Sequence, residues 1–469
     1  MTNKSLFFFV YFIIINQVID KSTNAEIFFK KQPSINSDDF ILSNYNVDIY
    51  ISFKIGYKKE TLEKIFLKSD TNEFMILKAG SPLFNNKYDP EESSSSKKIV
   101  YLKSYNLRYT LRASIYKDTF FFPNSENKEL TEFNDLSFLY ADSLLNEKYP
   151  GILGLKLVEN DIKNVKPFPC QFTDLNISNN ATWMIKFNND EEGIFYVGDI
   201  LNEKVFPGFN QEIYRKTNAV VYNIYLSWDL TFSQIKSDNI ILNGPMQAFL
   251  DFNFGLISCS KEYYDHIKNN FFHEYLKSGK CKEKFYNKDD GNNQIKINSN
   301  FTYIVCDKSL EEKDFPELIF SHSALDYSFK LTYEDVFVTY NDKIYFLIIN
   351  ETEKNERWKF GRIFFKKYNI IFDHNAKTIG IYDDSYSKSK ILLIVFEWII
   401  AIFLIMVAIF LAYTLFKRYR LNNYKLFIKR EKADEMEDNY GIFGNKKDDK
   451  MINMEETKNE QNKINIGNK

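Results

Sequence analysis

A long apolar run near the carboxyl end constrains this chain more than any other feature. Residues 391–416 contain one charged side chain, Glu397. A helix needs roughly 20 apolar residues to cross a bilayer, so this run is long enough to span with some tilt. Lys417, Arg418 and Arg420 follow directly, and positive residues stay on the cytoplasmic side. The sequence predicts a single-pass type I membrane protein with residues 26–390 facing outward, either outside the cell or in the lumen of the secretory or endosomal route.

The amino-terminal residues have the pattern of a secretory signal peptide. Lys4 supplies a positive charge, residues 6–15 are apolar, and small residues occur near Asn24 and Ala25. This order predicts a signal peptide over residues 1–25, with a buried N-terminal strand as the alternative. At the other end, residues 417–469 are rich in Lys, Glu, Asp and Asn, so we expect a disordered cytoplasmic tail.

Composition limits the partners and cofactors. The formal net charge of −2 gives no case for nucleic acid binding. The four cysteines all lie in the outward-facing part, which predicts two disulfides with three possible pairings. With four histidines and no tight ligand cluster, we expect no metal and no other cofactor. Four glycosylation sequons predict surface positions at Asn176, Asn180, Asn300 and Asn350.

Hydrophobic patterning predicts an all-β domain. Apolar side chains alternate with more polar ones from Val47 to Ile55 and stop at Gly56, as in a half-buried strand that ends in a turn. Residues 260–275 are the best helix candidate. More than 300 residues are too many for one core, so two lobes are expected, over residues 46–195 and 196–385. Residues 26–45 form a short segment before the first lobe in this interpretation.

An ordered set of motifs in residues 45–385 resembles the pepsin family of aspartic proteases. Each motif is weak alone, but about ten occur in the family's order with suitable gaps. They are the opening strand 46–56, Ser69-Asp70-Thr71-Asn72, Tyr88-Asp89-Pro90 with Ser93 to Ser96, Lys117-Asp118-Thr119, residues 150–155, 193–199 and 248–253, Cys281 with Cys306, residues 315–320, Trp358 to Arg362, residues 368–373, and Ile379-Gly380-Ile381.

The resemblance implies a bilobal fold and a pair of catalytic aspartates. Asp70 and Asp251 occupy the two Asp-Thr-Gly positions. In this family two such carboxylates share a proton, and together they activate a water against a peptide bond. The resemblance also implies a disulfide between Cys281 and Cys306, and a flap tyrosine at Tyr105 or Tyr109. The partner would be a peptide or protein, and a membrane anchor occurs in the β-secretase-like members.

Several positions depart from the family pattern around the two aspartates. Thr71 is kept, but Asn72 and Asn253 replace glycines that allow close backbone approach and unusual backbone angles, and asparagine tolerates positive φ better than most residues. Phe252 replaces a hydroxyl residue that hydrogen-bonds between the paired loops. The flap segment, residues 101–116, contains no glycine. Two functions are therefore expected: a membrane-anchored aspartic endopeptidase, or a catalytically impaired pseudo-protease that acts as a binding or scaffolding ectodomain.

Overall fold

The computed structural model describes residues 24–33, 37–78, 87–106, 110–123, 130–141, 150–157, 165–222, 225–238, 240–288, 297, 299–308, 310, 315–352 and 357–440. The chain divides into two compact units, residues 1–388 and 389–469. The predicted signal peptide lies outside the described residues, except that Asn24 and Ala25 begin the first strand.

The first unit is built mainly from strands. One sheet of thirteen described strands contains, in spatial order, β11 (Tyr214–Asn218), β26 (Thr378–Tyr382), β25 (Asn369–Asp373), β9 (Thr182–Phe187), β10 (Glu192–Gly198), β1 (Asn24–Pro33), β2 (Val47–Ile55), β3 (Glu60–Lys68), β8 (Gly151–Gly154), β4 (Phe74–Leu77), β7 (Leu130–Ala141), β6 (Thr110–Pro123) and β5 (Lys97–Asn106). Strands from both halves of the sequence meet in it, because β25 pairs with β9 in antiparallel register.

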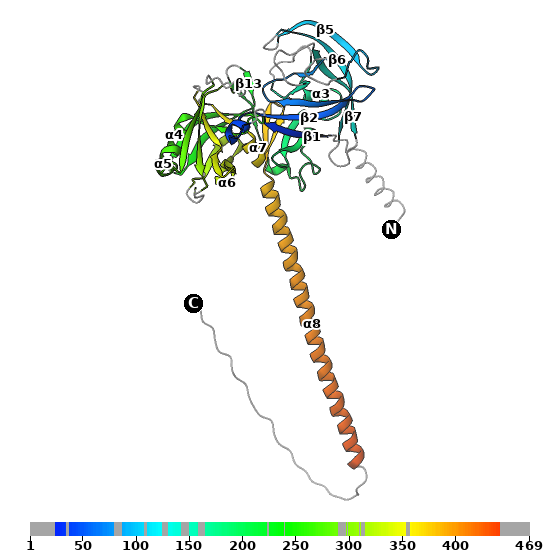
Figure 1. The fold of residues 1–469 in the computed structure, drawn as a ribbon. Coiled ribbons are helices and arrows are strands. Elements are labelled where there is room, and N and C mark those ends of the chain that lie inside the picture. The colour runs from blue at the N-terminus through cyan, green and yellow to red at the C-terminus, as the bar shows by residue number, and fades with distance from the viewer. Residues whose placement is uncertain are drawn as a thin grey trace, which may run out of the picture. The chain divides into compact units, whose positions relative to one another are not determined.

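A second sheet forms most of the other lobe. Its described strands are, in order, β20 (Tyr327–Leu331), β19 (Leu318–His322), β14 (Asp229–Ser237), β15 (Ile240–Leu250), β24 (Trp358–Phe360), β16 (Ile257–Ser258), β23 (Ile348–Glu351), β18 (Phe301–Asp307), β22 (Lys343–Phe346) and β21 (Phe337–Tyr340), with β17 (Cys281–Tyr286) on β18. A hairpin of β12 (Val220–Tyr222) and β13 (Tyr225–Ser227) stands apart. Figure 1 shows the blue and cyan strands gathered in one lobe and the green and yellow strands in the other. The predicted all-β bilobal fold is confirmed.

Short helices cover the sheets. They are α2 (Phe40–Tyr45), α3 (Phe168–Asp174), α4 (Lys261–Asn270), α5 (His273–Lys277), α6 (Tyr333–Val336) and α7 (Arg362–Lys367), with 3-10 turns η1 (Gln211–Ile213) and η3 (Ser323–Leu325). The helix predicted over residues 260–275 is present as α4 and most of α5. Ser260 caps α4 by accepting from the Tyr263 amide.

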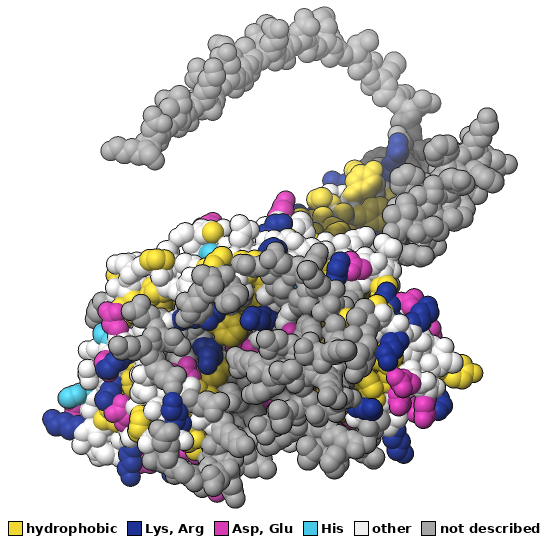
Figure 2. All heavy atoms as spheres, turned by 90° about the horizontal axis from the view of Figure 1, so that it is seen from above, with side chains coloured by type: hydrophobic (Ala, Val, Ile, Leu, Met, Phe, Trp, Pro, Cys, Tyr) yellow, Lys and Arg dark blue, Asp and Glu magenta, His cyan; other side chains and the backbone are white. Residues whose placement is uncertain are grey.

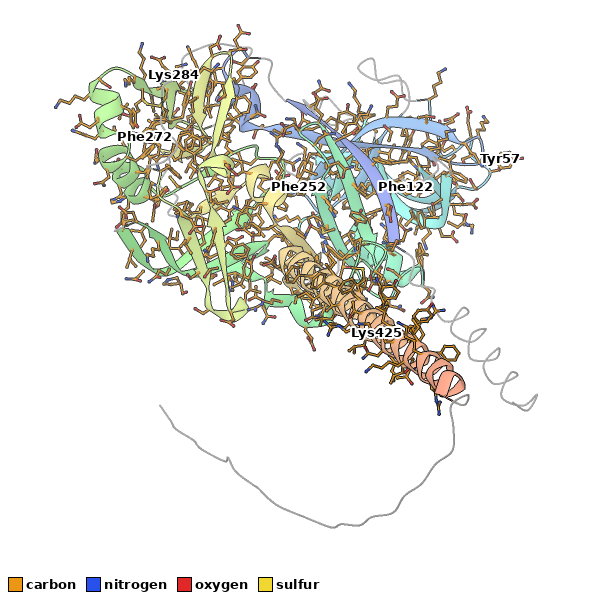
Figure 3. All side chains as sticks on the ribbon, turned by 90° about the horizontal axis from the view of Figure 1, so that it is seen from below. Tyr57, Phe122, Phe252, Phe272, Lys284 and Lys425 are labelled. Atoms are coloured by element: carbon orange, nitrogen blue, oxygen red, sulfur yellow. A yellow bond between two sulfur atoms is a disulfide. The ribbon has the colours of Figure 1, made fainter. Side chains whose placement is uncertain are left out.

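Aromatic side chains fill the cores of both lobes. Ile49, Ile51, Phe53 and Ile55 are buried along β2, as their alternation predicted. Trp183 stacks on Phe372 with ring centroids 4.1 Å apart, where strands from the two halves of the chain adjoin. Figure 3 shows Phe122 and Phe272 inside opposite lobes and Phe252 between them.

The surface of the first unit carries both signs of charge. On the face in Figure 2, described Lys and Arg side chains are interspersed with Asp and Glu. This mixture agrees with the small net charge of the whole chain.

Two predicted segment boundaries are wrong. Residues 26–45 do not precede the domain, because β1 pairs with both β10 and β2 and thereby enters the first sheet. The apolar side chains of Ile27 and Phe29 are buried there, which the polar neighbours in the sequence obscured. The lobe boundary predicted between residues 195 and 196 falls inside β10 and would divide this strand.

The second unit contains most of a single long helix, α8 (Asp384–Tyr440). The stretch Phe396–Arg430 is long and apolar enough to cross a membrane. The tail predicted to be disordered from residue 417 is instead helical to Tyr440. Its Lys, Arg, Glu and Leu side chains favour helix, and the first helix-breaking residue after the apolar run is Gly441. Residues 441–469 lie outside the described residues.

The predicted disulfide between Cys281 and Cys306 is confirmed, and it links paired positions of β17 and β18. A second disulfide between Cys170 and Cys259 is not formed. Cys259 is instead a buried thiol whose pKa is raised by burial.

The sequon at Asn350 is not a surface position. Its side chain is 7% exposed, and its amide nitrogen donates to the Cys259 carbonyl over 3.2 Å. A glycan cannot join an amide in that position without local unfolding. Asn176 and Asn180 are exposed, and Asn300 is half-buried.

Candidate active site

Two loops at equivalent places in the two lobes carry Asp70 and Asp251. The first follows β3, which pairs in parallel with β8, and the second follows β15, which pairs in parallel with β24. The segment after each aspartate then hydrogen-bonds to the glycine at or beyond the end of that neighbouring strand: Gly154 donates to the Glu73 carbonyl over 2.8 Å, and Gly361 donates to the Leu256 carbonyl over 2.9 Å. The local folds therefore match across the two lobes.

The glycines in these two contacts are required by close packing. A Cβ at Gly154 would lie 2.5 Å from the Thr71 carbonyl oxygen, and one at Gly361 would lie 2.1 Å from the Phe254 carbonyl oxygen. Both obstacles are backbone atoms, which cannot move aside as a flexible side chain can. The glycines that support the aspartate loops are thus kept on the neighbouring strands, although those inside the Asp-Thr-Gly motifs are lost.

Ser69 connects the first loop directly to the second aspartate. Its hydroxyl donates to Asp251 Oδ1 over 2.6 Å, and the backbone N–H of Asn253 donates to the same oxygen over 3.0 Å. Both hydrogen bonds from the described residues reach Oδ1, so Oδ2 is the oxygen available to a proton or a water. The sequence identified Ser69 only as the residue before Asp70 in the first motif, and this contact was not predicted.

The side chain of Asn253 joins the second loop to the opposite lobe. Its Nδ2 donates to the Leu67 carbonyl over 2.9 Å and to the Val47 carbonyl over 3.4 Å. Its Oδ1 accepts from the Ser69 amide over 3.2 Å. The side-chain amide of Asn253 therefore connects the two loops, at a position where the family pattern has a glycine and no side chain.

Neither asparagine adopts the backbone conformation that was expected of it. Asn72 and Asn253 both have negative φ, since neither is among the described non-glycine residues in the left-handed region. Replacing the motif glycines consequently creates no backbone strain at these two positions. Asparagine's tolerance of positive φ is therefore not used at either position.

Phe252 serves the core and not the loop contacts. Its side chain is fully buried, and its ring lies 6.0 Å from Trp183 and 6.2 Å from Phe365, edge to face in both cases. The hydroxyl-mediated contact of the family is absent here, as the sequence predicted, and apolar packing takes its place.

Glu73 is a part of the first loop that sequence reasoning missed. Its buried carboxylate accepts from the Thr71 hydroxyl and the Asn72 amide, each over 3.2 Å. Burial is the main cause that raises the pKa of Glu73, while these hydrogen bonds oppose the rise. The Thr71 hydroxyl is thus engaged within its own loop. An acidic residue directly before the apolar run 74–77 was the only available signal in the sequence.

The two aspartates have different surroundings. Asp251 lies deep in the fold although its side chain keeps partial exposure, and Asp70 is exposed. Burial is the main cause that raises the pKa of Asp251, and the nearby Asp70 charge raises it further. The Lys359 ammonium and the Ser69 hydroxyl favour the ionised form and act in the opposite direction. Lys359 lies 4.6 Å above the Phe254 ring and 3.5 Å from the Glu351 carboxylate.

The flap tyrosines remain untested predictions. Tyr109 lies outside the described residues, and only the backbone of Tyr105 is described, within β5. Strand β6, which pairs with β5, is held by hydrogen bonds to Asp118. The buried Asp118 carboxylate accepts from the Tyr88 hydroxyl over 2.7 Å and from Ser95 over 2.5 Å. Tyr88 and Ser95 belong to the segment that follows the first loop in the family's motif order.

No group of three or more His, Cys, Asp or Glu side chains in the described part of the chain is placed to hold a metal ion. The site therefore consists of two carboxylates and the hydroxyl, amide and ammonium groups around Asp251.

The fold, the matched loops and the aspartate in each lobe define a pepsin-like aspartic protease domain. A sequence model of the eukaryotic aspartyl protease family matches residues 78–383. The chain therefore belongs to this family. The matched range contains Asp251 and begins after Asp70. A search of curated proteins finds no match.

Proposed function

We propose that the chain is a membrane-anchored aspartic endopeptidase that cleaves extended peptides outside the cytosol. Asp70 and Asp251 share one proton in this proposal. Asp251 carries it, because its pKa is raised by burial and by the Asp70 charge. Asp70 then acts as the base toward a water that attacks the peptide carbonyl, and Asp251 acts as the acid toward the carbonyl oxygen.

The observation that carries this proposal is the 2.6 Å hydrogen bond from Ser69 to Asp251. Ser69 directly precedes Asp70, so this bond brings the first aspartate's loop onto the second aspartate. Catalysis depends on such positioning, since a displacement of about 1 Å can cost on the order of 100-fold in rate. The additional bonds from Asn253 to Leu67 and Ser69 support the same geometry.

The membrane orientation belongs to the same proposal. A signal peptide at residues 1–25 and the basic residues after the apolar run would place the first unit in an extracytosolic compartment. Oxidising conditions there would permit the Cys281–Cys306 disulfide. Protease added to the cytosolic side of sealed vesicles should then shorten the chain from its carboxyl end and spare the first unit. Digestion of the first unit with sparing of the tail would contradict this orientation.

Peptide cleavage tests the enzymatic proposal. The purified full-length chain should cleave a mixed peptide library at acidic pH, and both Asp70→Ala and Asp251→Ala should abolish cleavage. Pepstatin, which binds the paired carboxylates of this family, should inhibit it. Cleavage that persists in either alanine variant would contradict the proposed roles of the two aspartates.

A second candidate function is a pseudo-protease that binds peptides without cleaving them. Two positions favour it. The Thr71 hydroxyl donates to Glu73 within its own loop, and the hydroxyl residue that the family has after the second aspartate is replaced by the buried Phe252 ring. Peptide or pepstatin binding without any cleavage at acidic pH would support this candidate. Cleavage that depends on both aspartates would exclude it.

A further inference from the structure

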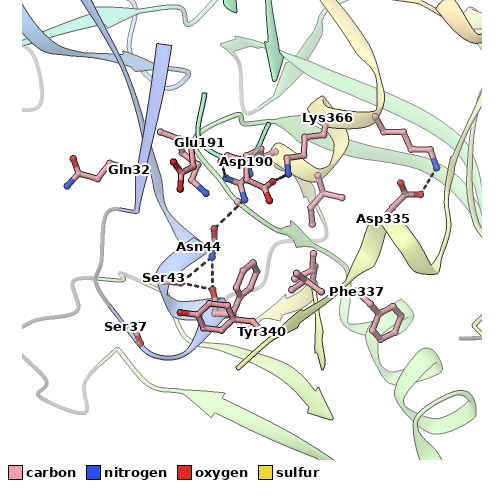
Figure 4. Close-up of a pocket in the computed structure, with 18 of the residues that line it drawn as sticks. Gln32, Ser37, Ser43, Asn44, Asp190, Glu191, Asp335, Phe337, Tyr340 and Lys366 are labelled. Carbon is pink, nitrogen blue, oxygen red and sulfur yellow. Dashed lines mark hydrogen bonds and ion pairs between the residues drawn. The ribbon is translucent and has the colours of Figure 1, made fainter. Parts of the chain in front are cut away.

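A large cavity lies in the first unit, and Gly255, four positions after Asp251, is one of its lining residues. Its volume is about 1140 Å³, slightly above the range of roughly 300–1,000 Å³ that is typical of small-molecule sites. Its walls come from β1, α2, the turn before β10, α6 and α7, so segments far apart in the sequence enclose it. No residue from 69–72 or 251–253 lines it. Figure 4 shows labelled polar side chains such as Asn44, Asp190 and Lys366 around this space.

Two cationic groups in the wall have no carboxylate partner among the described residues. Arg362 is only 6% exposed, and its guanidinium donates to neutral acceptors: Asn44 Oδ1 over 3.3 Å and the Asp190 carbonyl over 3.2 Å. Lys31 is half-buried and makes no ion pair with the part of the chain that the structure describes. Burial of a cation without an anion is unfavourable, so these two groups are unusual.

The other charges of the cavity are already engaged or exposed. Lys366 pairs with Asp190, and Lys367 pairs with Asp335. These pairs leave Lys31 and Arg362 without an ion pair among the described residues, although the exposed Glu191 attracts Lys31 and the exposed Asp38 and Glu334 also line the cavity.

Burial and neighbouring cations both act on Lys31. The pKa of Lys31 is lowered to about 7, by burial first and then by the Arg362 and Lys366 charges. Burial also lowers the pKa of Arg362 to about 10. An anion among these groups would reverse both effects. The titratable and charged groups that line this cavity with Lys31 are Asp38, Tyr50, Asp190, Glu191, Glu334, Asp335, Tyr340, Arg362, Lys366 and Lys367.

Apolar side chains complete the cavity. Phe337, Leu347 and Ile363 line it and are each largely buried, with 8% of their surface exposed. A site with two cations that have no ion pair among the described residues, beside an apolar wall, suits a ligand that has one anionic end and one apolar part.

We propose that this Lys31–Arg362 cavity binds a small amphipathic anion. Its carboxylate or phosphate group pairs with Lys31 and Arg362, and its apolar part packs against Phe337, Leu347 and Ile363. The ligand would connect β1 to α7, and therefore strands of the first sheet to the helix that follows Gly361. The proposal does not rest on the protease activity, because neither Asp70 nor Asp251 lines the cavity.

Binding of three matched six-carbon probes tests the proposal on the full-length chain in lipid nanodiscs. The probes are hexanoate, hexyl phosphate and hexan-1-ol, and empty nanodiscs give the correction for partition into lipid. Isothermal titration should show that at least one of the anions binds at least about tenfold more tightly than the alcohol, since charge-assisted hydrogen bonds contribute most of that difference. The stronger of the two anions identifies carboxylate or phosphate as the preferred group.

Variants of two neighbouring lysines locate the site. Lys31→Met should weaken binding of the preferred anion about tenfold or more, and Lys31→Arg should retain most of it. Lys30→Met is the matched control, because Lys30 is exposed in the same strand and does not line the cavity. Lys30→Met should bind as the unmodified chain does. Equal binding to the Lys31→Met chain, or no binding of either anion at millimolar concentration, would overturn the proposal.

Proton uptake supplies a second readout. At pH 8 a lysine with a pKa of about 7 is mostly neutral, so anion binding should capture a proton. Titrations in Tris and HEPES, which differ in ionisation enthalpy, should give different apparent binding enthalpies. This difference should disappear in Lys31→Met and persist in Lys30→Met. Anion binding with no proton uptake at pH 8 would contradict a role for Lys31.

Discussion

The Ser69 hydroxyl and the Asp251 carboxylate, 182 positions apart in the sequence, are joined by a hydrogen bond of 2.6 Å. Ser69 is itself almost fully buried, so water does not readily replace this donor. The bond connects the two aspartate loops through the hydroxyl of the residue before Asp70. In the family pattern, the hydroxyl of the residue after each aspartate makes the contact between the loops. The stability of the site therefore depends on Ser69 more than on Thr71.

Ser69→Ala should destabilise the folded chain. Because the proposal places the shared proton on Asp251, the ordinary range of roughly 0.5–1.5 kcal/mol for a hydrogen bond applies. We expect a loss of about 1 kcal/mol in the free energy of unfolding, since Asp251 keeps its bond from the Asn253 backbone N–H. Urea denaturation of the full-length chain measures the change. Ser323→Ala, at an exposed serine, is the control and should alter the free energy by less than about 0.5 kcal/mol. Equal effects of the two substitutions would contradict a special role for Ser69.

Asn253→Gly, which restores the family's residue, should lower stability. The substitution removes the amide that contacts Leu67, Val47 and Ser69, and it adds chain entropy to the unfolded state. We expect a loss of about 2 kcal/mol or more in the free energy of unfolding. Asn243→Gly, at an exposed asparagine of β15, controls for the effect of glycine itself. A more stable Asn253→Gly chain would show that the amide contacts contribute little.

Phe252→Thr should also destabilise the chain, although it returns the missing hydroxyl. Removing a fully buried phenylalanine costs about 3–5 kcal/mol through lost apolar contact and a cavity. Phe252→Leu should cost less, because leucine fills more of the space beside Trp183 and Phe365. Thermal unfolding of both variants measures the difference. Substitutions that restore the family motif at positions 72, 252 and 253 alone would leave a cavity. A compensating substitution at Trp183 or Phe365 should therefore accompany them.

The strands could be predicted because their patterns are local in the sequence. The contacts between the two loops could not be predicted, because they join residues that are far apart in the sequence. Alternation over Val47–Ile55 identifies a strand without reference to any other segment, and the resemblance to the pepsin family pointed to both aspartates. The bond from Ser69 to Asp251 and those from Asn253 to Leu67 require knowledge of which side chains meet across the lobes. The burial of Asn350 is of the same kind, since its sequon is indistinguishable from one on the surface.

The buried His374 should make the fold less stable in acid. Its pKa is lowered from 6.5 to about 3 by burial, and its ring lies edge-on to Trp228. Because the folded pKa is below the unfolded one, the stabilising effect of the neutral ring is complete above pH 6.5 and is lost as the pH falls toward 3. At pH 5 the loss is about 2 kcal/mol. Chemical denaturation of the unmodified chain at pH 7.5 and pH 5 should detect it.

His374→Phe should remove this part of the pH dependence, whereas His273→Gln, at an exposed histidine, should leave it unchanged. An equal loss of stability between pH 7.5 and pH 5 in the unmodified and His374→Phe chains would show that His374 is not the cause. The result also bears on function, because an endopeptidase that works in acid must retain its fold there.

Lys359→Met should move the alkaline limb of the cleavage profile to higher pH. Cleavage requires one proton on the pair, and the proposal assigns that proton to Asp251. The Lys359 charge lowers the pKa of Asp251, so its removal should raise that pKa and preserve the protonated form at higher pH. Activity is lost as the pH rises through the pKa of Asp251, and the pH of half-maximal cleavage should rise accordingly.

Lys359 also pairs with Glu351, so thermal unfolding must show that the variant is folded. The half-maximal pH is independent of the amount of folded enzyme, which separates this effect from lost stability. Lys343→Met, at an exposed lysine of β22, should leave the profile unchanged. A profile that stays in place, or moves to lower pH, in Lys359→Met would mean that Asp251 does not carry the proton that cleavage requires.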